Sequence, residues 1–269
     1  MIMTTAFAPQ VIRAGLTGVF ALLLCALARD AGAFAVNSYP VGDEILYNKW
    51  GDNHAGTIGG VVTWSFIPAG TPGSSYCNAV CPEFSVSSIN LEISPGGGFA
   101  PATLVSLEAH ITAMMDVWSA ATGIVFVKID PDSGVAINDG LAVPNATGQI
   151  RIGAFAFGDN SAAGVGYSPP PNGGTGAGDI LLNANFYYQI APGNEGDAYD
   201  RTYAPNDFDG LILHELGHAI GFEHPAYDGT CPVMQVDEAC LGKINRQLDA
   251  DDIAGARFLY DRVFASGFE

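Results

Sequence analysis

One segment of eleven residues, 214–224, constrains this chain more than any other feature. It reads His-Glu-Leu-Gly-His-Ala-Ile-Gly-Phe-Glu-His, and it holds three of the five histidines in the whole chain. A single histidine is most often an ordinary polar residue, and two histidines four residues apart are a weak signal. Three histidines at these spacings, with an adjacent glutamate and a turn glycine, predict a metal site.

The first part of the segment lies in a predicted helix. Apolar residues recur at helical spacing over residues 208–219, and Asp207 or Asp209 can cap the start of this helix with a carboxylate. Positions i and i+4 of a helix share one face. His214 and His218 can therefore bind the same metal ion.

The rest of the segment supplies a base and a third ligand. Glu215 lies next to the first ligand, where it can reach a water on the metal without binding the metal itself. Gly221 permits a sharp turn, which brings His224 back towards the other histidines. Three nitrogens leave a tetrahedral zinc with one open position for water. Zinc lowers the pKa of that water from ~15.7 to about 7, and we expect Glu215 to act as the general base.

The whole segment resembles the zinc motif of the metzincin endopeptidases. In that clan a methionine turn lies beneath the zinc, downstream of the third histidine, and Met234 in the stretch Cys-Pro-Val-Met-Gln looks like that residue. A lone methionine would otherwise be core filling. Astacins and serralysins carry an extra zinc-binding tyrosine after this methionine, and none stands at that spacing here. The resemblance therefore implies one zinc with three protein ligands, His214, His218 and His224.

Other segments are similar to the matrixins, the matrix-metalloprotease-like branch of this clan. They are residues 104–126, 178–183, 248–255 and 259–260. The resemblance, which spans residues 61–261, implies that Asp251 or Asp252 supports the methionine turn. It also implies that the edge strand which pairs with the substrate backbone contains Gly164, Val165, Gly166 and Tyr167. A flexible surface loop is the alternative for that stretch.

The chain departs from the animal matrixins in several places. His224 is followed by Pro-Ala-Tyr, which looks more like the serralysin branch. Animal matrixins bind a second zinc through further histidines, but only His54 and His110 remain here, and neither lies in the matching region. We therefore expect no second zinc. No cysteine lies between residue 33 and the first predicted strand, so we also expect no latency through a propeptide cysteine.

Calcium is a second metal that the sequence allows. Asp159, Asp179 and Asn183 carry oxygen donors of the type that calcium prefers. The same residues can equally serve in turns and helix caps, and both interpretations stay open.

The N-terminus predicts export. Arg13 precedes an apolar run over residues 14–28, and Ala31-Gly32-Ala33 is a small-residue cleavage site, with Ala33-Phe34-Ala35 as the alternative. The apolar run is shorter than the ~20 residues of a membrane-spanning helix. The expected organisation is a signal peptide at residues 1–33, an N-terminal extension at 34–57, one catalytic domain at 58–263 and a short tail at 264–269.

The cysteines and the charge fit an exported protein. Four cysteines follow the signal, and an even count favours two disulfides, most simply Cys77–Cys81 and Cys231–Cys240. A zinc held by all four thiolates is the alternative. The formal charge of −18 argues against nucleic acid or an anionic membrane as a partner. It is compatible with calcium binding, with cationic substrates or with a solvated acidic surface.

The predicted elements indicate an α+β fold. Strands are expected at residues 61–66, 124–129 and 149–157, and helices at 104–121, 208–219 and 251–262. The resemblance implies a zincin-like, metzincin-like domain with a twisted, mixed and mostly parallel sheet, long helices and a loop-rich C-terminal subdomain. We expect a secreted, monomeric zinc endopeptidase that acts on protein or peptide substrates. The alternatives are a non-catalytic binding module on the same scaffold and a metal hydrolase of a non-peptide substrate.

Overall fold

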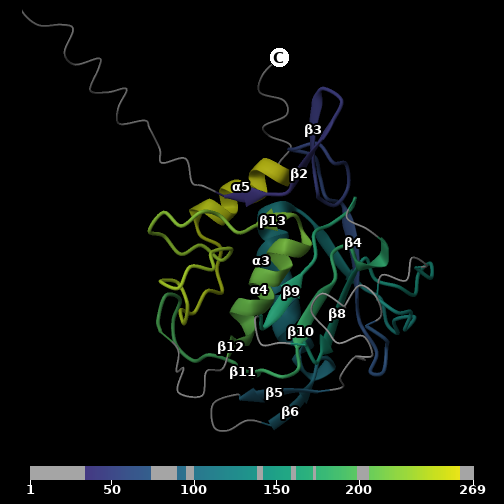
Figure 1. The fold of residues 1–269 in the computed structure, drawn as a ribbon, viewed down its shortest axis with the longest axis vertical. Coiled ribbons are helices and arrows are strands. Elements are labelled where there is room, and N and C mark those ends of the chain that lie inside the picture. Colours follow the sequence, from purple (N-terminus) through teal and green to yellow (C-terminus); the bar gives the residue numbers. More distant parts are fainter. Residues whose placement is uncertain are drawn as a thin grey trace, which may run out of the picture. The chain divides into compact units, whose positions relative to one another are not determined.

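The computed structural model describes residues 34–73, 90–94, 100–137, 142–158, 162–171, 174–198 and 206–260. These residues belong to one compact unit, Ala33–Glu269. Helices and strands occur together, as the predicted α+β class requires (Figure 1). The predicted signal peptide and tail lie outside the described residues, as do Cys77, Cys81 and Asp159.

The main sheet has five strands in the spatial order β7-β4-β8-β10-β9. Neighbouring strands are parallel except for β9, which runs antiparallel to β10 at one edge of the sheet. The prediction of a mixed, mostly parallel sheet is therefore confirmed. In chain order the strands are β4 (Val61–Phe66), β7 (Val125–Lys128), β8 (Ile150–Phe155), β9 (Gly164–Gly166) and β10 (Ile180–Asn183).

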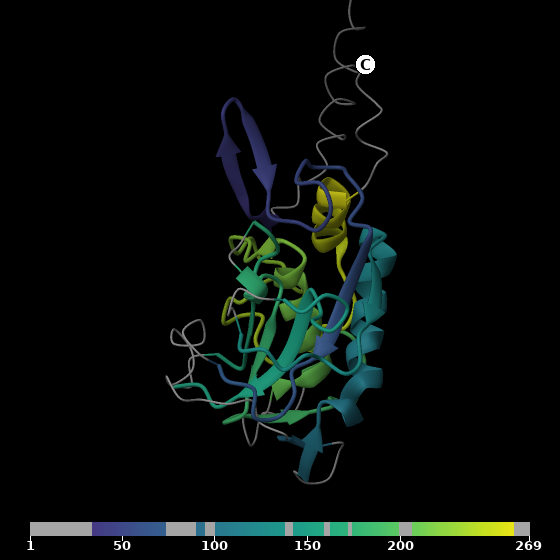
Figure 2. The same ribbon diagram turned by 90° about the vertical axis from the view of Figure 1, so that its right-hand side faces the viewer.

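Two long helices, α3 (Glu108–Thr122) and α4 (Phe208–Ala219), pack against each other and against this sheet (Figure 1 and Figure 2). Helix α3 begins later than the sequence predicted, because residues Val105–Leu107 form a separate 3-10 turn, η1. The bounds of α4 agree with the prediction. A third helix, α5 (Ala250–Tyr260), packs against α3.

The start of α4 differs from the prediction in one respect. Asp207 occupies the N-cap position, but its side chain makes no capping hydrogen bond. Its Oδ1 accepts a bond from the backbone amide of Ala191 at 3.4 Å instead. Asp207 also ends the short strand β12 (Asn206–Asp207), which directs its carboxylate towards this neighbouring loop. Asp209, the other predicted cap, faces His110 of α3, with 2.9 Å between Oδ1 and Nδ1.

The apolar core lies mainly between the sheet and the helices. Its largest fully buried side chain, Trp118 of α3, also donates a hydrogen bond from Nε1 to the carbonyl of Leu213 in α4 at 2.8 Å. A smaller cluster around Phe155 and Leu181 is separate from this core. Alternate side chains of a strand point to opposite faces, so the central strands, which are buried throughout, contribute to both clusters.

The N-terminal segment, predicted to be an extension before the domain, belongs to the same compact unit. Strand β1 (Ala35–Val36) pairs with β13 (Phe222–Glu223), which lies directly before His224. Strands β2 (Ser38–Val41) and β3 (Glu44–Tyr47) form a hairpin. The chain then returns to the core, where Lys49 and Trp50 are buried.

The remaining strands form a second sheet, and the C-terminal part is rich in loops. The order is β12-β11-β5-β6, with β5 (Asn90–Ser94), β6 (Ala100–Thr103) and β11 (Tyr187–Gln189); η2 (Gly174–Gly176) is a further 3-10 turn. Residues 224–249 contain no helix or strand. The predicted disulfide Cys231–Cys240 is present there, with 5.4 Å between the Cα atoms. Within the described parts of the chain, no helix has the length and apolarity to cross a membrane.

Candidate metal centre

Three imidazoles converge at the C-terminal half of α4. His214 and His218 lie on one face of the helix, and His224 follows β13. Nε2 of His224 is 3.1 Å from Nε2 of His214 and 2.9 Å from Nε2 of His218. Among the described residues, these three form the one group of three or more histidines, cysteines or carboxylates close enough to share an ion.

The hydrogen bonds of the rings leave the inward nitrogens free to bind a metal. Nδ1 of His214 donates to the carbonyl of Val233 at 2.7 Å, and Nδ1 of His218 donates to the carbonyl of Phe222 at 2.8 Å. A neutral imidazole that donates from Nδ1 carries its lone pair on Nε2. Such bonds commonly fix the orientation of metal-ligating histidines.

Burial keeps these imidazoles neutral. It lowers the pKa of His214 to about 3, with the neighbouring His218 as the second cause. Burial likewise lowers the pKa of His218 and of His224. Zinc bound by tetrahedral nitrogens at 2.0–2.1 Å would hold them roughly 3.3–3.4 Å apart, close to the observed separations. The donor set therefore fits a zinc ion.

Glu215 is buried beside this cluster, with 4 % of its surface exposed. Burial raises the pKa of its carboxyl to about 8, although the backbone amide of Gly166 opposes the shift. A divalent cation nearby would lower this pKa again. A carboxylate that titrates near neutral pH is suited to moving a proton.

Two glycines let the sheet edge approach Glu215. A Cβ atom at Gly164 would lie 2.9 Å from Oε1 of Glu215, and one at Gly166 would lie 2.4 Å from its backbone carbonyl oxygen. A side chain at either of these two positions would push β9 away from α4. The predicted edge strand ends at Gly166; Tyr167 lies beyond it and packs against the Phe155 cluster, so only the first three predicted residues line the site.

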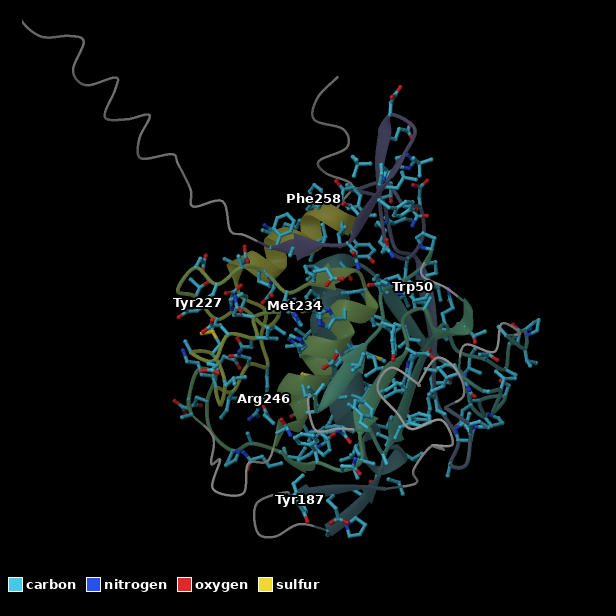
Figure 3. All side chains as sticks on the ribbon, viewed as in Figure 1. Trp50, Tyr187, Tyr227, Met234, Arg246 and Phe258 are labelled. Carbon is cyan, nitrogen blue, oxygen red and sulfur yellow. A yellow bond between two sulfur atoms is a disulfide. The ribbon has the colours of Figure 1, made fainter. Side chains whose placement is uncertain are left out.

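Met234 lies against the helix that carries the first two histidines (Figure 3). Its side chain is buried, and a Cβ atom at Gly217 would be 2.2 Å from its Sδ atom. Asp252 accepts hydrogen bonds from the amides of Val233 at 2.9 Å and Met234 at 3.4 Å. The other predicted support, Asp251, makes no such bond to the methionine turn within the described residues; burial raises the pKa of its carboxyl, and the backbone of Phe34 opposes that rise.

The turn before the third histidine requires glycine. Gly221 has a φ of +109°, which L residues with a side chain rarely adopt. A Cβ atom there would also lie 2.2 Å from the carbonyl oxygen of Asn48. The backbone of the N-terminal segment therefore occupies the space that a side chain would need.

The three histidines line a cleft of about 650 Å³. One wall is β9, one is α4, and the third comes from the loop closed by the disulfide. On the third wall Val236 and Leu241 are apolar and Gln235 is polar, and Leu211 adds an apolar side chain from α4.

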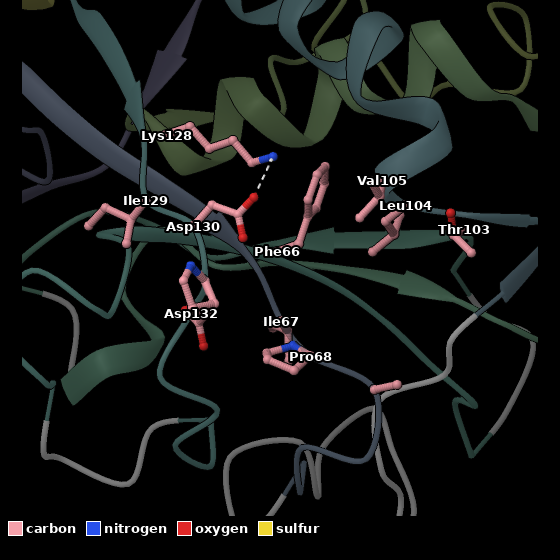
Figure 4. A pocket seen from close by; sticks show the side chains of 12 residues that line it. Phe66, Ile67, Pro68, Thr103, Leu104, Val105, Lys128, Ile129, Asp130 and Asp132 are labelled. Carbon is pink, nitrogen blue, oxygen red and sulfur yellow. Dashed lines mark ion pairs between the residues drawn. The ribbon is translucent and has the colours of Figure 1, made fainter.

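A second pocket, of about 450 Å³, lies near the end of β7, the strand at the opposite edge of the sheet from β9 (Figure 4). Its cation, Lys128, is already paired with Glu108 at 2.6 Å and with Asp130 at 3.5 Å. The pocket contains no histidine or cysteine. The histidine cleft is therefore the candidate functional site.

Two predicted calcium ligands have protein partners. Oδ1 of Asp179 accepts from the backbone amide of Arg151 at 3.0 Å, and burial raises the pKa of Asp179 well above its ordinary value. Oδ1 of Asn183 accepts from the amides of Asn185 at 3.0 Å and Phe157 at 3.3 Å. Oδ2 of Asp179 is buried without a hydrogen-bond partner among the residues that the structure describes, and calcium binding by these residues stays a prediction. In the described ranges neither residue joins a metal-ligating group.

The two remaining histidines also lie apart from the cluster. His110 pairs with Asp209, and His54 pairs with Asp52 and Glu44 at an exposed site. Sequence reasoning missed the role of Gly217. The available signal was a glycine inside a helix, which costs ~1 kcal/mol relative to alanine unless packing requires it.

Comparison of the chain with known protein-family models and with curated proteins found no match to either.

Proposed function

We propose that the protein is a secreted zinc endopeptidase with a metzincin-like, matrixin-like catalytic domain. The observation that carries the proposal is the convergence of the Nε2 atoms of His214, His218 and His224 beside buried Glu215. Three neutral nitrogen ligands and an adjacent carboxylate that does not belong to the ligand set are the arrangement of a hydrolytic zinc site.

The chain's own residues have distinct roles in this proposal. The three imidazoles would hold the zinc, which when bound supplies a Lewis acid that lowers the pKa of water and polarises a carbonyl. Glu215 takes a proton from the attacking water and later transfers it to the leaving amine. Its burial among β9 and α4 excludes bulk water from the carboxylate and fixes its position relative to the cleft.

An extended peptide suits the shape of the site. Among the described residues, strand β9 pairs with β10 alone and is the last strand of its sheet. The backbone groups on the outer side of an edge strand can pair with an added strand. Gly164, Val165 and Gly166 also line the cleft that contains the histidines. A peptide paired with β9 would therefore lie across the metal ligands.

The test compares zinc content and peptide cleavage in matched variants. Glu215→Gln should retain one zinc per chain and lose ~100- to 10,000-fold of the cleavage rate, the usual contribution of a general base. His224→Ala should lose the zinc as well. Both are measured with a quenched-fluorescence peptide library, with chelation and zinc readdition as the control on the native chain.

Two results would contradict the proposal. Glu215→Gln cleaving at the native rate with bound zinc would show that the assigned base is wrong. A native chain with full zinc occupancy that cleaves no peptide of the library would exclude the endopeptidase. That second result would leave a binding module or a hydrolase of non-peptide substrates.

Export is tested separately. The secreted chain should begin at Phe34, immediately after the Ala-Gly-Ala cleavage site, or at Val36 if the alternative site is used. Mass spectrometry of the protein from the culture medium measures the N-terminus. Retention of residues 1–33 in a cell-bound product would contradict this part of the proposal.

A further inference from the structure

The position of the third histidine depends on a short connection. His214 and His218 are fixed to each other by α4, but His224 lies beyond the helix end. Residues 219–223 carry the chain from one to the other. Whatever holds these five residues in place also sets the distance of the third imidazole from the first two.

The helix end leaves backbone carbonyls without partners in the helix itself. Two of them are satisfied locally. The carbonyl of Gly217 accepts from the amide of Ile220 at 3.2 Å, and that of His218 accepts from the amide of Gly221 at 3.0 Å. The carbonyls of Ala219, Ile220 and Gly221 accept no hydrogen bond from within this turn. Their partners elsewhere in the chain therefore determine its path.

These next three carbonyls accept hydrogen bonds from residues distant in sequence. Two donors belong to the N-terminal segment and one to α5, and Trp50 of that segment is labelled in Figure 3. The pairs are Trp50 Nε1 to Ala219 at 2.8 Å, the Tyr260 hydroxyl to Ile220 at 2.6 Å, and the backbone amide of Asn37 to Gly221 at 3.3 Å. The Tyr260 hydroxyl also accepts from the amide of Trp50 at 3.2 Å, which joins two of the donors.

Asn37 links residues 219–223 to the β9 side of the cleft. Its Nδ2 donates to Oγ of Ser168, just after β9, at 2.8 Å, and also to the carboxylate of Glu223, the residue before His224. Strand β1, which precedes Asn37, pairs with Phe222 and Glu223 in register. In Figure 1 the purple N-terminal segment accordingly lies next to β13.

We propose that residues 35–50 position His224 and thereby belong to the metal centre, with Asn37 and Trp50 as its positioning residues. The proposal rests on the zinc site proposed above. Partners that orient a ligand typically contribute 10- to 100-fold to metal affinity. The hydrogen bonds that the structure describes for these two residues go to residues 219–223 and their neighbours and not to the imidazoles, so each acts through the connection that ends at His224.

The test uses the whole exported chain, stripped of metal and titrated with zinc against a chromophoric chelator. Asn37→Ala and Trp50→Phe should each weaken zinc binding about 10-fold. The matched control is Asn53→Ala. Asn53 lies just beyond residues 35–50, and its Nδ2 also makes two bonds, to the carbonyls of Tyr47 at 2.8 Å and Pro170 at 3.3 Å, but neither bond reaches residues 219–224. Its zinc affinity should stay within about twofold of the native value.

Cobalt substitution separates positioning from general destabilisation. The d–d spectrum of the cobalt form reports the coordination of the ion, so it should change in Asn37→Ala and Trp50→Phe and not in Asn53→Ala. Thermal unfolding of the metal-free variants shows whether each chain is folded. If one positioning variant does not fold, the other carries the test.

The outcomes distinguish this inference from the function on which it rests. If the native chain binds no zinc, or binds it equally well as His224→Ala, both fail. If the native site needs His224 while both folded positioning variants keep native affinity and the native cobalt spectrum, only the positioning role is overturned.

Discussion

Replacing Gly221 by alanine should destabilise this protein more than replacing a left-handed glycine that has open space around it. Two effects add at this position. A side chain at positive φ costs roughly 1–3 kcal/mol, and φ here is +109°. The new Cβ would also lie 2.2 Å from the carbonyl oxygen of Asn48, and relieving such overpacking costs about 1–3 kcal/mol more. The reduced entropy of the unfolded chain returns only ~0.4–1 kcal/mol.

Gly123 is the matched control for this prediction. It ends α3 with a φ of +70°, and a Cβ there would meet nothing within 4 Å. Gly123→Ala should therefore cost about 1 kcal/mol, and Gly221→Ala about 3 kcal/mol or more. Urea unfolding of the metal-free proteins measures both. Equal losses within ~0.5 kcal/mol would refute the claim that the Asn48 carbonyl fills the site.

The other predictions concern the surroundings of the site. Gly217→Ala should destabilise the chain by about 1–2 kcal/mol despite better helix propensity, because the new methyl group meets Met234. Truncating that methionine to alanine in the same chain should remove the penalty, so a double-mutant cycle without coupling would contradict the packing. Burial raises the pKa of Asp207 from 3.8 to about 6, because the protonated carboxyl is easier to bury than the carboxylate. The stability that depends on this proton is fully present below pH 3.8 and is lost as the pH rises through 6. Asp207→Asn should therefore remove about 3 kcal/mol of the stability change between about pH 4 and pH 7; unfolding curves parallel to the native ones would contradict this. Cys231→Ser should cost about 2–3 kcal/mol, the entropy of a loop of this length, and native stability under reducing conditions would count against that value.

Local patterns predicted most elements of the fold. Helix α4 has the predicted bounds because its apolar spacing is regular and its end is marked by glycine. The strands β4, β7 and β8 appear within a residue or two of their predicted positions, since β-branched residues and turn signals are local properties. The three histidines and Glu215 were predicted together, because helical geometry alone places two ligands and the base.

The N-terminal segment could not be predicted in this way. Its sequence is polar and mixed, and it carries no regular period. Trp50 meets its carbonyl partner 169 residues away, and the bond from its amide to Tyr260 spans 210 residues. Hydrogen bonds of this range depend on the assembled fold, so a pattern within the segment cannot reveal them. The same holds for Asn48, whose carbonyl explains why Gly221 must be glycine.

The site therefore combines a local part with a long-range part, and the two respond differently to perturbation. Helix α4 alone can orient His214 and His218, but under the proposed positioning role the third nitrogen reaches them only when residues 35–50 and α5 have folded onto the helix. Nε2 of His224 lies 3.1 Å from that of His214 and 2.9 Å from that of His218, and their lone pairs repel one another until a cation or a proton lies between them. The hydrogen bonds of the N-terminal segment and of α5 oppose that repulsion in the folded chain. A metal that binds only this assembled arrangement stabilises all of it at once, by about 4 kcal/mol at a concentration of 1,000 Kd. Folding of the N-terminal segment and zinc affinity are then coupled properties of one unit.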